Sequence, residues 1–399
     1  MLGLLLAGCA RIIIPIPVFI PVQQSSSQVA APAATQTLTQ TTSLAPTQTT
    51  SPTASTEYLT QALNFAPTGT RALYFTNWAL IKAYKGVPTL NSQSPLDARM
   101  EFLLSLNQDQ AAPVVYGSRA FLRFAEEWSW DSTDLLWEAM IDSEGSPVYI
   151  LKLRDDFDLA PVLAHFDERG FGQQMLDATT IYTHEIALAE DWFTIGELSI
   201  ANTAVIAEAK IFVLSSSLDR LQTVVERYQE KGSTLGDDQS VLATITGLGE
   251  VAAAIVTPGS DTCRGLSFAA ITQSLLQGEA LSEEQIAELK TQLLGEAVFH
   301  TYSGFALGYR YEEEKPVGLV VMHYANAADA QADLDARRTA AEEGMSQATN
   351  QPFSEGVFTV DGADVIDSEL ILRLRPYEDR PARLFQLFFY RDMAFAGCP

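Results

Sequence analysis

The histidines are the first side chains in this sequence to test for chemistry, and the chain has four of them. His184-Glu185 begins the zinc motif His-Glu-x-x-His, but position 188 is a leucine, so the motif is incomplete. His300 lies close to Ser303 in sequence and would form a nucleophilic triad only if an acid converged on it from elsewhere. The sequence therefore predicts no catalytic residue, and it favours a protein that is not an enzyme.

An acidic cluster, Asp155-Asp156-Phe157-Asp158, is a second candidate. Its carboxylates could supply oxygen ligands to Ca²⁺, but no Asp-x-Asp-x-Asp-Gly loop is present. The same acids would favour the N-terminus of a helix that follows them. We predict no metal and no cofactor, and keep Asp155, Asp156 and Asp158 only as weak metal candidates.

Three tryptophans, Trp128, Trp130 and Trp137, are close together in sequence and could line a groove for a carbohydrate or a peptide. Large aromatic side chains are more often part of a core in a domain of this size. We favour the core and keep the groove as the alternative.

The N-terminal segment Leu6-Ala7-Gly8-Cys9 resembles the lipobox of bacterial lipoproteins. The resemblance implies that residues 1–8 are a signal peptide, and that Cys9 receives lipid and becomes the anchor. Because no Lys or Arg precedes the short apolar run, we expect the signal peptide to be truncated at its start. A spanning helix over 1–22 is the alternative, which Arg11 and three closely spaced prolines oppose.

The segment from Gln23 to Thr56 contains no charged residue and is rich in Ser, Thr, Gln, Ala and Pro. Such a composition buries too little apolar surface to offset the entropy of ordering. Residues 9–56 are therefore predicted to be a lipid anchor and a disordered tether, which would hold the rest of the chain outside the cytoplasm at the bacterial membrane.

Charge is concentrated beyond this tether. The 399-residue chain has 25 Lys and Arg against 50 Asp and Glu, a net charge of −25. Arg11 is the only charged residue before Glu57. So acidic a domain is not expected to bind nucleic acid, whose affinity comes largely from cations that meet phosphates.

The remaining chain repeats a pattern of two strands and a helix. Residues 135–141 and 147–153 read as a hairpin, with a helix expected from about Leu159. Residues 303–311 and 317–324 read as another hairpin, followed by a helix over 327–343.

Further strands are expected after each helix: 180–188 and 192–195 in the first copy, and 365–374 and 383–390 in the second. A third copy reads as strands at 203–206 and 210–214 with a helix over 218–231. Two more helices are expected at 266–276 and 283–294.

The fold class predicted is α+β. We expect two related β-β-α-β-β modules, 57–260 and 261–399, with antiparallel sheets and helices on one face of each. Cys263 and Cys398 are the two cysteines left once Cys9 carries lipid, and in an exported protein we predict that they form a disulfide. Two free redox thiols are the alternative.

These observations predict a cell-envelope lipoprotein with a non-catalytic binding or scaffolding domain outside the cytoplasm. Its partners would be the membrane, through the anchor, and an envelope protein or glycan. One alternative is a solute-binding lipoprotein of a transporter, which would need a central parallel sheet in each of two lobes. The other is an envelope hydrolase, which would need two carboxylates about 5 to 9.5 Å apart in a pocket.

Overall fold

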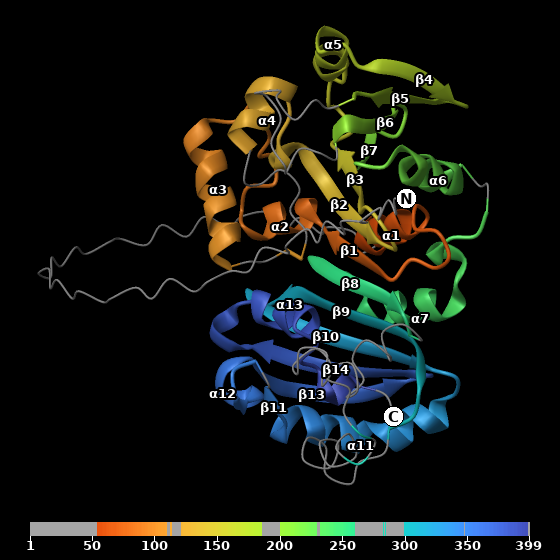
Figure 1. Cartoon of the computed structure of the whole chain (residues 1–399). Helices are drawn as coiled ribbons and strands as arrows, with labels where there is room; N and C mark the ends of the chain where they lie inside the picture. Colours follow the sequence, from red (N-terminus) through yellow and green to blue (C-terminus); the bar gives the residue numbers. More distant parts are fainter. Residues whose placement is uncertain are drawn as a thin grey trace, which may run out of the picture. The chain divides into compact units, whose positions relative to one another are not determined.

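The fold was obtained as a computed structural model of the whole chain (Figure 1). It describes residues 54–109, 112–113, 121–185, 200–229, 232–259, 282, 284, 299–346 and 348–397. The chain divides into a unit of residues 1–50 and a compact unit of residues 51–399, and all described residues belong to the second. Several predicted features lie outside the described residues: the signal peptide, Cys9, most of the tether, Cys263 and Cys398. The same holds for the strand at 192–195, the end of the strand at 180–188, and, apart from position 284, the helices at 266–276 and 283–294.

The centre of the described unit is one sheet of twelve strands in which every neighbouring pair is antiparallel. In sheet order the strands are β13 (Phe358–Ile366), β14 (Glu369–Pro376), β10 (Lys315–Tyr324), β9 (Tyr302–Glu312), β8 (Ala253–Pro258), β1 (Ala72–Thr76), β2 (Leu135–Asp142), β3 (Val148–Leu153), β7 (Ile211–Ser215), β6 (Asn202–Ile206), β5 (Thr179–Thr183) and β4 (Gly172–Leu176). The α+β class with antiparallel pairing is confirmed, and strands from 57–260 and from 261–399 share this one sheet.

The strand order repeats on either side of the pair formed by β1 and β8. Outward from this pair, one half runs β1-β2-β3-β7-β6 and the other runs β8-β9-β10-β14-β13. Each half begins with a meander of three strands, β1-β2-β3 or β8-β9-β10. A hairpin that comes later in the chain, after a helix, then pairs with the last strand of the meander: β7 with β3, and β14 with β10. The hairpin of β4 and β5 extends the first half only, and no described strand continues the sheet beyond β13.

Helices cover both faces of the sheet, because successive strand residues point to opposite faces and both faces are apolar. On β1, Tyr74 belongs to one core cluster, whereas Leu73 and Phe75 belong to the other. The first face carries α2 (Trp78–Tyr84), α3 (Leu96–Asp109), α4 (Phe121–Trp128), α5 (Ala160–Glu168), α11 (Ala327–Glu343), α12 (Phe353–Gly356) and α13 (Ala382–Phe389). The second face carries α1 (Ala54–Leu63), α6 (Leu218–Tyr228) and α7 (Gln239–Leu248).

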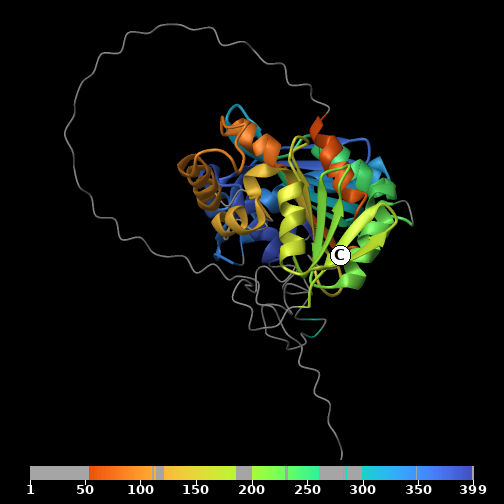
Figure 2. The same cartoon turned by 90° about the horizontal axis from the view of Figure 1, so that it is seen from above.

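The view from above shows this layering, with the orange helices α2 and α3 on one side of the strands and the green helix α6 on the other (Figure 2). The expectation of helices on one face only was therefore wrong. Residues on both sides of the pleat are apolar, so each face of the sheet needs a cover.

Local sequence determines several boundaries. Asn326 caps α11, since its side chain accepts a hydrogen bond from Asp329 N at 2.9 Å, and α11 spans the expected 327–343. Gly170 follows α5 with φ +72°, a conformation that favours glycine at the end of a helix. The hairpin of β9 and β10 closes through Glu313 and Glu314, both at positive φ, as a two-residue loop of type I′ requires.

Two expected C-terminal strands were wrong. Residues 383–389 belong to helix α13 (Ala382–Phe389), in which Leu384, Phe385 and Leu387 are buried and Pro381 precedes the first turn. The expected strand 365–374 contains a turn, so β13 ends at Ile366 and β14 begins at Glu369. Apolar residues lie on both sides of this turn, so the hydrophobic pattern along the chain gave no sign that one strand ends and another begins there.

Candidate functional site

The most concentrated set of interacting polar side chains in the second half lies between α11 and the sheet. Asp333 of α11 accepts hydrogen bonds from His300 Nδ1 at 2.6 Å, Tyr324 Oη at 2.9 Å and Arg337 Nε at 3.0 Å. It also accepts from the backbone N–H of His300 at 2.9 Å. The Asp333 side chain is only 1% exposed, so its charge is held by these donors rather than by water. We call Asp333, His300, Tyr324 and Arg337 the polar cluster.

The Nη1 and Nη2 groups of Arg337 donate hydrogen bonds to backbone carbonyls. Nη1 donates to the carbonyls of Phe395 and Gly397 at 2.9 and 3.0 Å, and Nη2 donates to the carbonyl of His300 at 3.1 Å. Its carbon lies 4.2 Å from the ring centre of Phe299. The side chain is fully buried and joins the C-terminal segment and the start of β9 to helix α11.

His300 is the one exposed member of the polar cluster, with 46% of its side chain accessible. The hydrogen bond and the charge of Asp333 raise the pKa of His300 above its ordinary value. An acid has therefore converged on His300, as a triad would need, but Ser303 Oγ donates to the carbonyl of His323 at 3.3 Å. The pair of His300 and Asp333 can take up a proton. The other described groups that bond to this pair hold the fold together, and Ser303 is not among them.

A second buried ionic cluster lies where the helices of the first half meet β2. Asp131 and Asp134 are fully buried at the ends of a short capping box around η1 (Ser132–Asp134). Asp131 pairs with Arg99, and Asp134 Oδ1 lies 3.2 Å from Arg154 Nε. These contacts join α3, β2 and the segment after β3.

Lys82 of α2 completes this region. It donates to the carbonyls of Thr133 at 2.8 Å and Leu90 at 3.3 Å, and it is only 3% exposed. Burial lowers the pKa of Lys82 to about 8, against the attraction of Asp134.

The acidic candidates for metal binding are used in other ways. Asp155 Oδ1 lies 2.6 Å from Lys152 Nζ, and Asp156 Oδ1 lies 2.7 Å from Arg154 Nη1. Asp158 accepts a hydrogen bond from Ala160 N at the start of α5. No group of three or more His, Cys, Asp or Glu side chains within the described ranges is arranged to hold a metal ion.

The three candidate tryptophans lie in the core. Trp128 and Trp130 are 1% exposed and belong to the core on the first face, whereas Trp137 is fully buried in the core on the second. Trp128 packs on Phe166 with Arg169 over its ring. Because the sheet separates Trp137 from the other two, these side chains do not line one groove, and the expected core placement is what the structure has.

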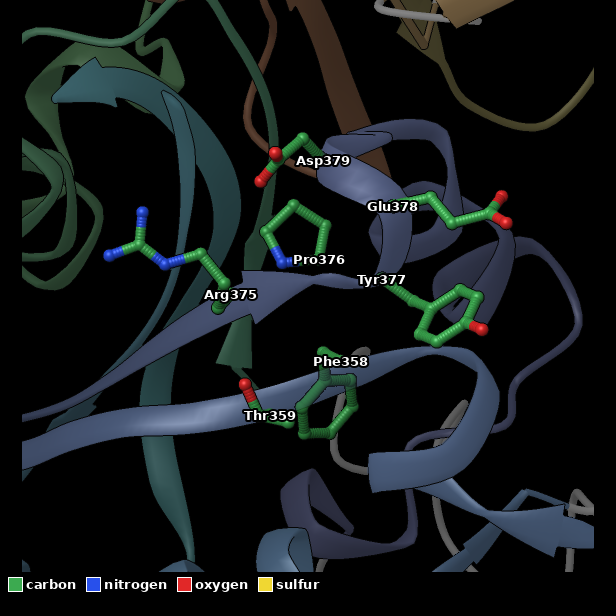
Figure 3. A pocket seen from close by; sticks show the side chains of 7 residues that line it. All are labelled: Phe358, Thr359, Arg375, Pro376, Tyr377, Glu378 and Asp379. Carbon is green, nitrogen blue, oxygen red and sulfur yellow. The ribbon is translucent and has the colours of Figure 1, made fainter. Parts of the chain in front are cut away.

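A small open cavity of about 240 Å³ lies where β14 ends. Its lining residues are Phe358, Thr359, Arg375, Pro376, Tyr377, Glu378 and Asp379 (Figure 3). The carboxyl groups of Glu378 and Asp379 point to opposite sides in Figure 3, so they do not converge as a hydrolytic pair would.

The end of the sheet at β4 is the remaining feature with an accessible binding chemistry. Gly172, Gln173, Gln174 and Met175 are exposed and Leu176 is half-buried, with Met175 65% accessible. Among the described strands β4 pairs with β5 only. The side of β4 that faces away from β5 pairs with no described strand, and none of its five side chains carries a charge.

Comparisons with known proteins add little to this geometry. No family model matches the chain, and no curated protein matches it. Crystal forms I, III and IV of a protein called TP0453 are similar to it at 8% identity, with TM-scores of 0.38, 0.36 and 0.38. The similarity covers 82% of this chain and 98%, 98% and 96% of the other chains. At these values the likeness supports no conclusion about function.

The polar cluster and the β4 edge were both missed from sequence. His300 and Asp333 are 33 positions apart, and nothing in their spacing shows that they meet. Gln173 and Gln174 belong to no recognisable motif. The signal that could have pointed to β4 is that residues 170–176 carry no charge and follow a helix with Asp167 and Glu168 at its end.

Proposed function

We propose that this chain is a lipoprotein of the bacterial cell envelope. Acylated Cys9 would hold it at the membrane, and residues up to 56 would carry the folded unit clear of the membrane surface, outside the cytoplasm. The lipobox resemblance at residues 6–9 and the uncharged composition of residues 23–56 support this proposal. No helix in the described part of the chain is both long and apolar enough to cross a bilayer.

The folded unit would bind or scaffold an envelope protein or glycan and catalyse no reaction. The observation that carries this proposal is the β4 edge, an exposed and uncharged strand whose outer side pairs with no described strand. The polar cluster favours the same interpretation, because Asp333 and Arg337 are bonded to backbone groups, to each other and to the side chains of Tyr324 and His300.

The alternatives gain less from the structure. A transporter's solute-binding lipoprotein would have a parallel sheet in each lobe, and every described strand pair is antiparallel. A carboxylate hydrolase would need converging acids, and the two at the described cavity diverge (Figure 3).

Lipid attachment is tested by metabolic labelling with a radioactive fatty acid in a bacterium that expresses the full chain. We expect label in the wild-type protein and none in Cys9→Ser. Equal labelling of both, or of neither, would overturn the anchoring proposal.

Binding is tested by chemical crosslinking of the full chain in its own envelope, followed by affinity purification and mass spectrometry. The control is a strain that lacks the chain. We expect one or a few partners enriched over the control, and recovery of background proteins alone would contradict a scaffolding role.

A further inference from the structure

We infer that Ser129 is a nucleophilic serine, activated by His165 and Glu168, that accepts an acyl group from a carboxylic ester. The three side chains are bonded in the order hydroxyl, imidazole, carboxylate, which is the order found in activated serines. The inference goes beyond the proposed binding function, because it adds a site of covalent modification to the folded unit. It concerns the acylation of Ser129 alone and requires no turnover.

The hydrogen bonds between these side chains have the geometry that activation needs. Ser129 Oγ lies 3.0 Å from His165 Nε2. His165 Nδ1 lies 3.3 Å from Glu168 Oε2, three residues further along helix α5. Because an ionised carboxylate only accepts hydrogen bonds, Glu168 favours the neutral tautomer in which Nδ1 carries the proton. Nε2 is then an acceptor, and the hydroxyl of Ser129 donates to it.

Packing between α4 and α5 brings the serine and the histidine together. Ser129 directly follows α4, and His165 lies in α5. The sequence neighbours of these two residues are Trp128 and Phe166, whose buried rings pack with their centres 5.1 Å apart. A contact in the core therefore sets the separation of the hydroxyl and the imidazole.

The backbone of Ser129 has a conformation that favours glycine. Its φ is +60°, and it follows α4 much as Gly170, at φ +72°, follows α5. Glycine adopts this conformation without the penalty that a Cβ brings. What serine adds over glycine at this position is the hydroxyl that reaches His165, and residues held in such conformations cluster at functional sites.

The reacting groups are accessible, as attack on an ester requires. Ser129 is half-buried, and 27% of the His165 side chain is exposed. A cation lies on the same segment of chain: Arg169 donates to the carbonyl of Glu127 at 2.8 Å, and its guanidinium carbon is 4.2 Å from the ring centre of Trp128. These two residues directly precede Ser129, so the arginine brings positive charge to the region where the oxyanion develops.

The step is a balanced acyl transfer. Oγ of Ser129 attacks the carbonyl carbon of the ester, and His165 Nε2 takes the hydroxyl proton. The new bond joins Oγ to the acyl carbon, the bond from that carbon to the alcohol oxygen breaks, and His165 returns the proton to the departing alcohol. The products are an acyl-serine and an alcohol.

The test is covalent labelling of the full chain in detergent by an alkyl fluorophosphonate, from which an activated serine displaces fluoride. Mass spectrometry of peptides locates the adduct. We expect one adduct per chain, on Ser129, and no adduct at this position in Ser129→Ala. His165→Asn removes the base and should slow labelling about a hundredfold or more. Ser303→Ala is the matched control and should label like the wild type, because the Ser303 hydroxyl donates to a backbone carbonyl at 3.3 Å.

Glu168 is a positioning residue, and its contribution is measured with p-nitrophenyl acetate. Glu168→Gln should lower the maximal rate of acylation about threefold to tenfold and leave unchanged the ester concentration that gives half of that rate. The effect is modest because 71% of the carboxylate side chain is exposed to water. Asp167→Asn is the control, since Asp167 bonds to Gln173, and it should acylate like the wild type. Thermal unfolding shows whether each variant has folded.

A wild type that carries no adduct on Ser129 would overturn the inference, as would equal labelling rates in the wild type and His165→Asn. Release of one equivalent of nitrophenol that then stops would support acylation without turnover. Sustained release that is lost in Ser129→Ala would support the nucleophile and contradict the proposal that the unit catalyses no reaction. If Ser129 is labelled but the crosslinking experiment captures no partner, the binding role alone fails.

Discussion

Asp333 and Arg337 lie one turn apart on α11, and Oδ2 of Asp333 is 3.0 Å from Nε of Arg337 with both side chains buried. The pair does more than stabilise its own helix. Through Asp333 it holds the N–H of His300, and through Arg337 it holds the carbonyls of Phe395 and Gly397. Three segments distant in sequence are thereby joined at one charged pair.

Loss of one member of this pair should be costly. Arg337→Met leaves the buried carboxylate of Asp333 without its cation and three backbone carbonyls without a donor, so we expect the free energy of unfolding to fall by about 3–5 kcal/mol. Urea denaturation measures it. Arg338→Met is the matched control, because Arg338 pairs with Asp335 at 3.1 Å in the same helix but both side chains are exposed. It should cost no more than about 0.5 kcal/mol, and equal effects of the two changes would contradict the prediction.

His300 should make stability depend on pH. Asp333 raises the pKa of His300 above its ordinary 6.5, so folding favours the protonated imidazole. The stabilisation is fully present below the pKa of the unfolded chain and is lost as the pH rises through the folded pKa. We expect the difference in melting temperature between wild type and His300→Gln to shrink as the pH is raised from about 6 to about 8. A difference that does not change with pH would show that the pair does not titrate as described.

Lys82 should act in the opposite sense at higher pH. Burial lowers its pKa to about 8 from 10.5, so between these values the unfolded chain binds more protons than the folded chain. Stability contributed by this group should therefore rise with pH over that interval. Lys82→Met should lack the rise when unfolding free energies of both proteins are measured from pH 7.5 to 10.5. Parallel curves for the two proteins would count against it.

We expect Trp128, Trp130 and Trp137 to contribute to the stability of the fold. Trp128→Ala, Trp130→Ala and Trp137→Ala each remove a side chain no more than 1% exposed, and each should lower the free energy of unfolding by about 3–5 kcal/mol. Tyr377→Ala, at an exposed position, serves as the control and should change it little. A glycan array tests the alternative that these side chains line a binding groove. Glycan binding that is present in the wild type and lost in variants of unchanged stability would favour the groove over the core.

The cysteine pair remains a prediction from sequence. We expect Cys263 and Cys398 of the exported protein to be resistant to a thiol reagent in denaturant without reductant, and to react after reduction. The disulfide would close a loop of about 135 residues, and in the chain-entropy model its loss would cost at most about 5 kcal/mol. Two reactive thiols before reduction would contradict it.

Several parts of the fold could be predicted because they depend on nearby residues. The hairpin at 303–324 and helix 327–343 follow from alternation, turn residues and the Asn326 cap, all within short stretches of chain. The segment at 383–390 failed because a short apolar run does not distinguish strand from helix. Its conformation depends on what it covers: Phe385 packs 6.0 Å from Tyr309 of β9, ring centre to ring centre.

The sequence by itself determined the acidic charge, the lipobox resemblance at residues 6–9, the uncharged segment 23–56, and the alternation of hairpins and helices. Only the tertiary structure decided that the two halves share one sheet, that Asp333 meets His300, and that β4 is the last described strand at one end of that sheet. The physical reason is that composition and local periodicity act over a few residues. Pairing between β1 and β8, or between α11 and the C-terminal segment, depends on contacts between residues far apart in the chain.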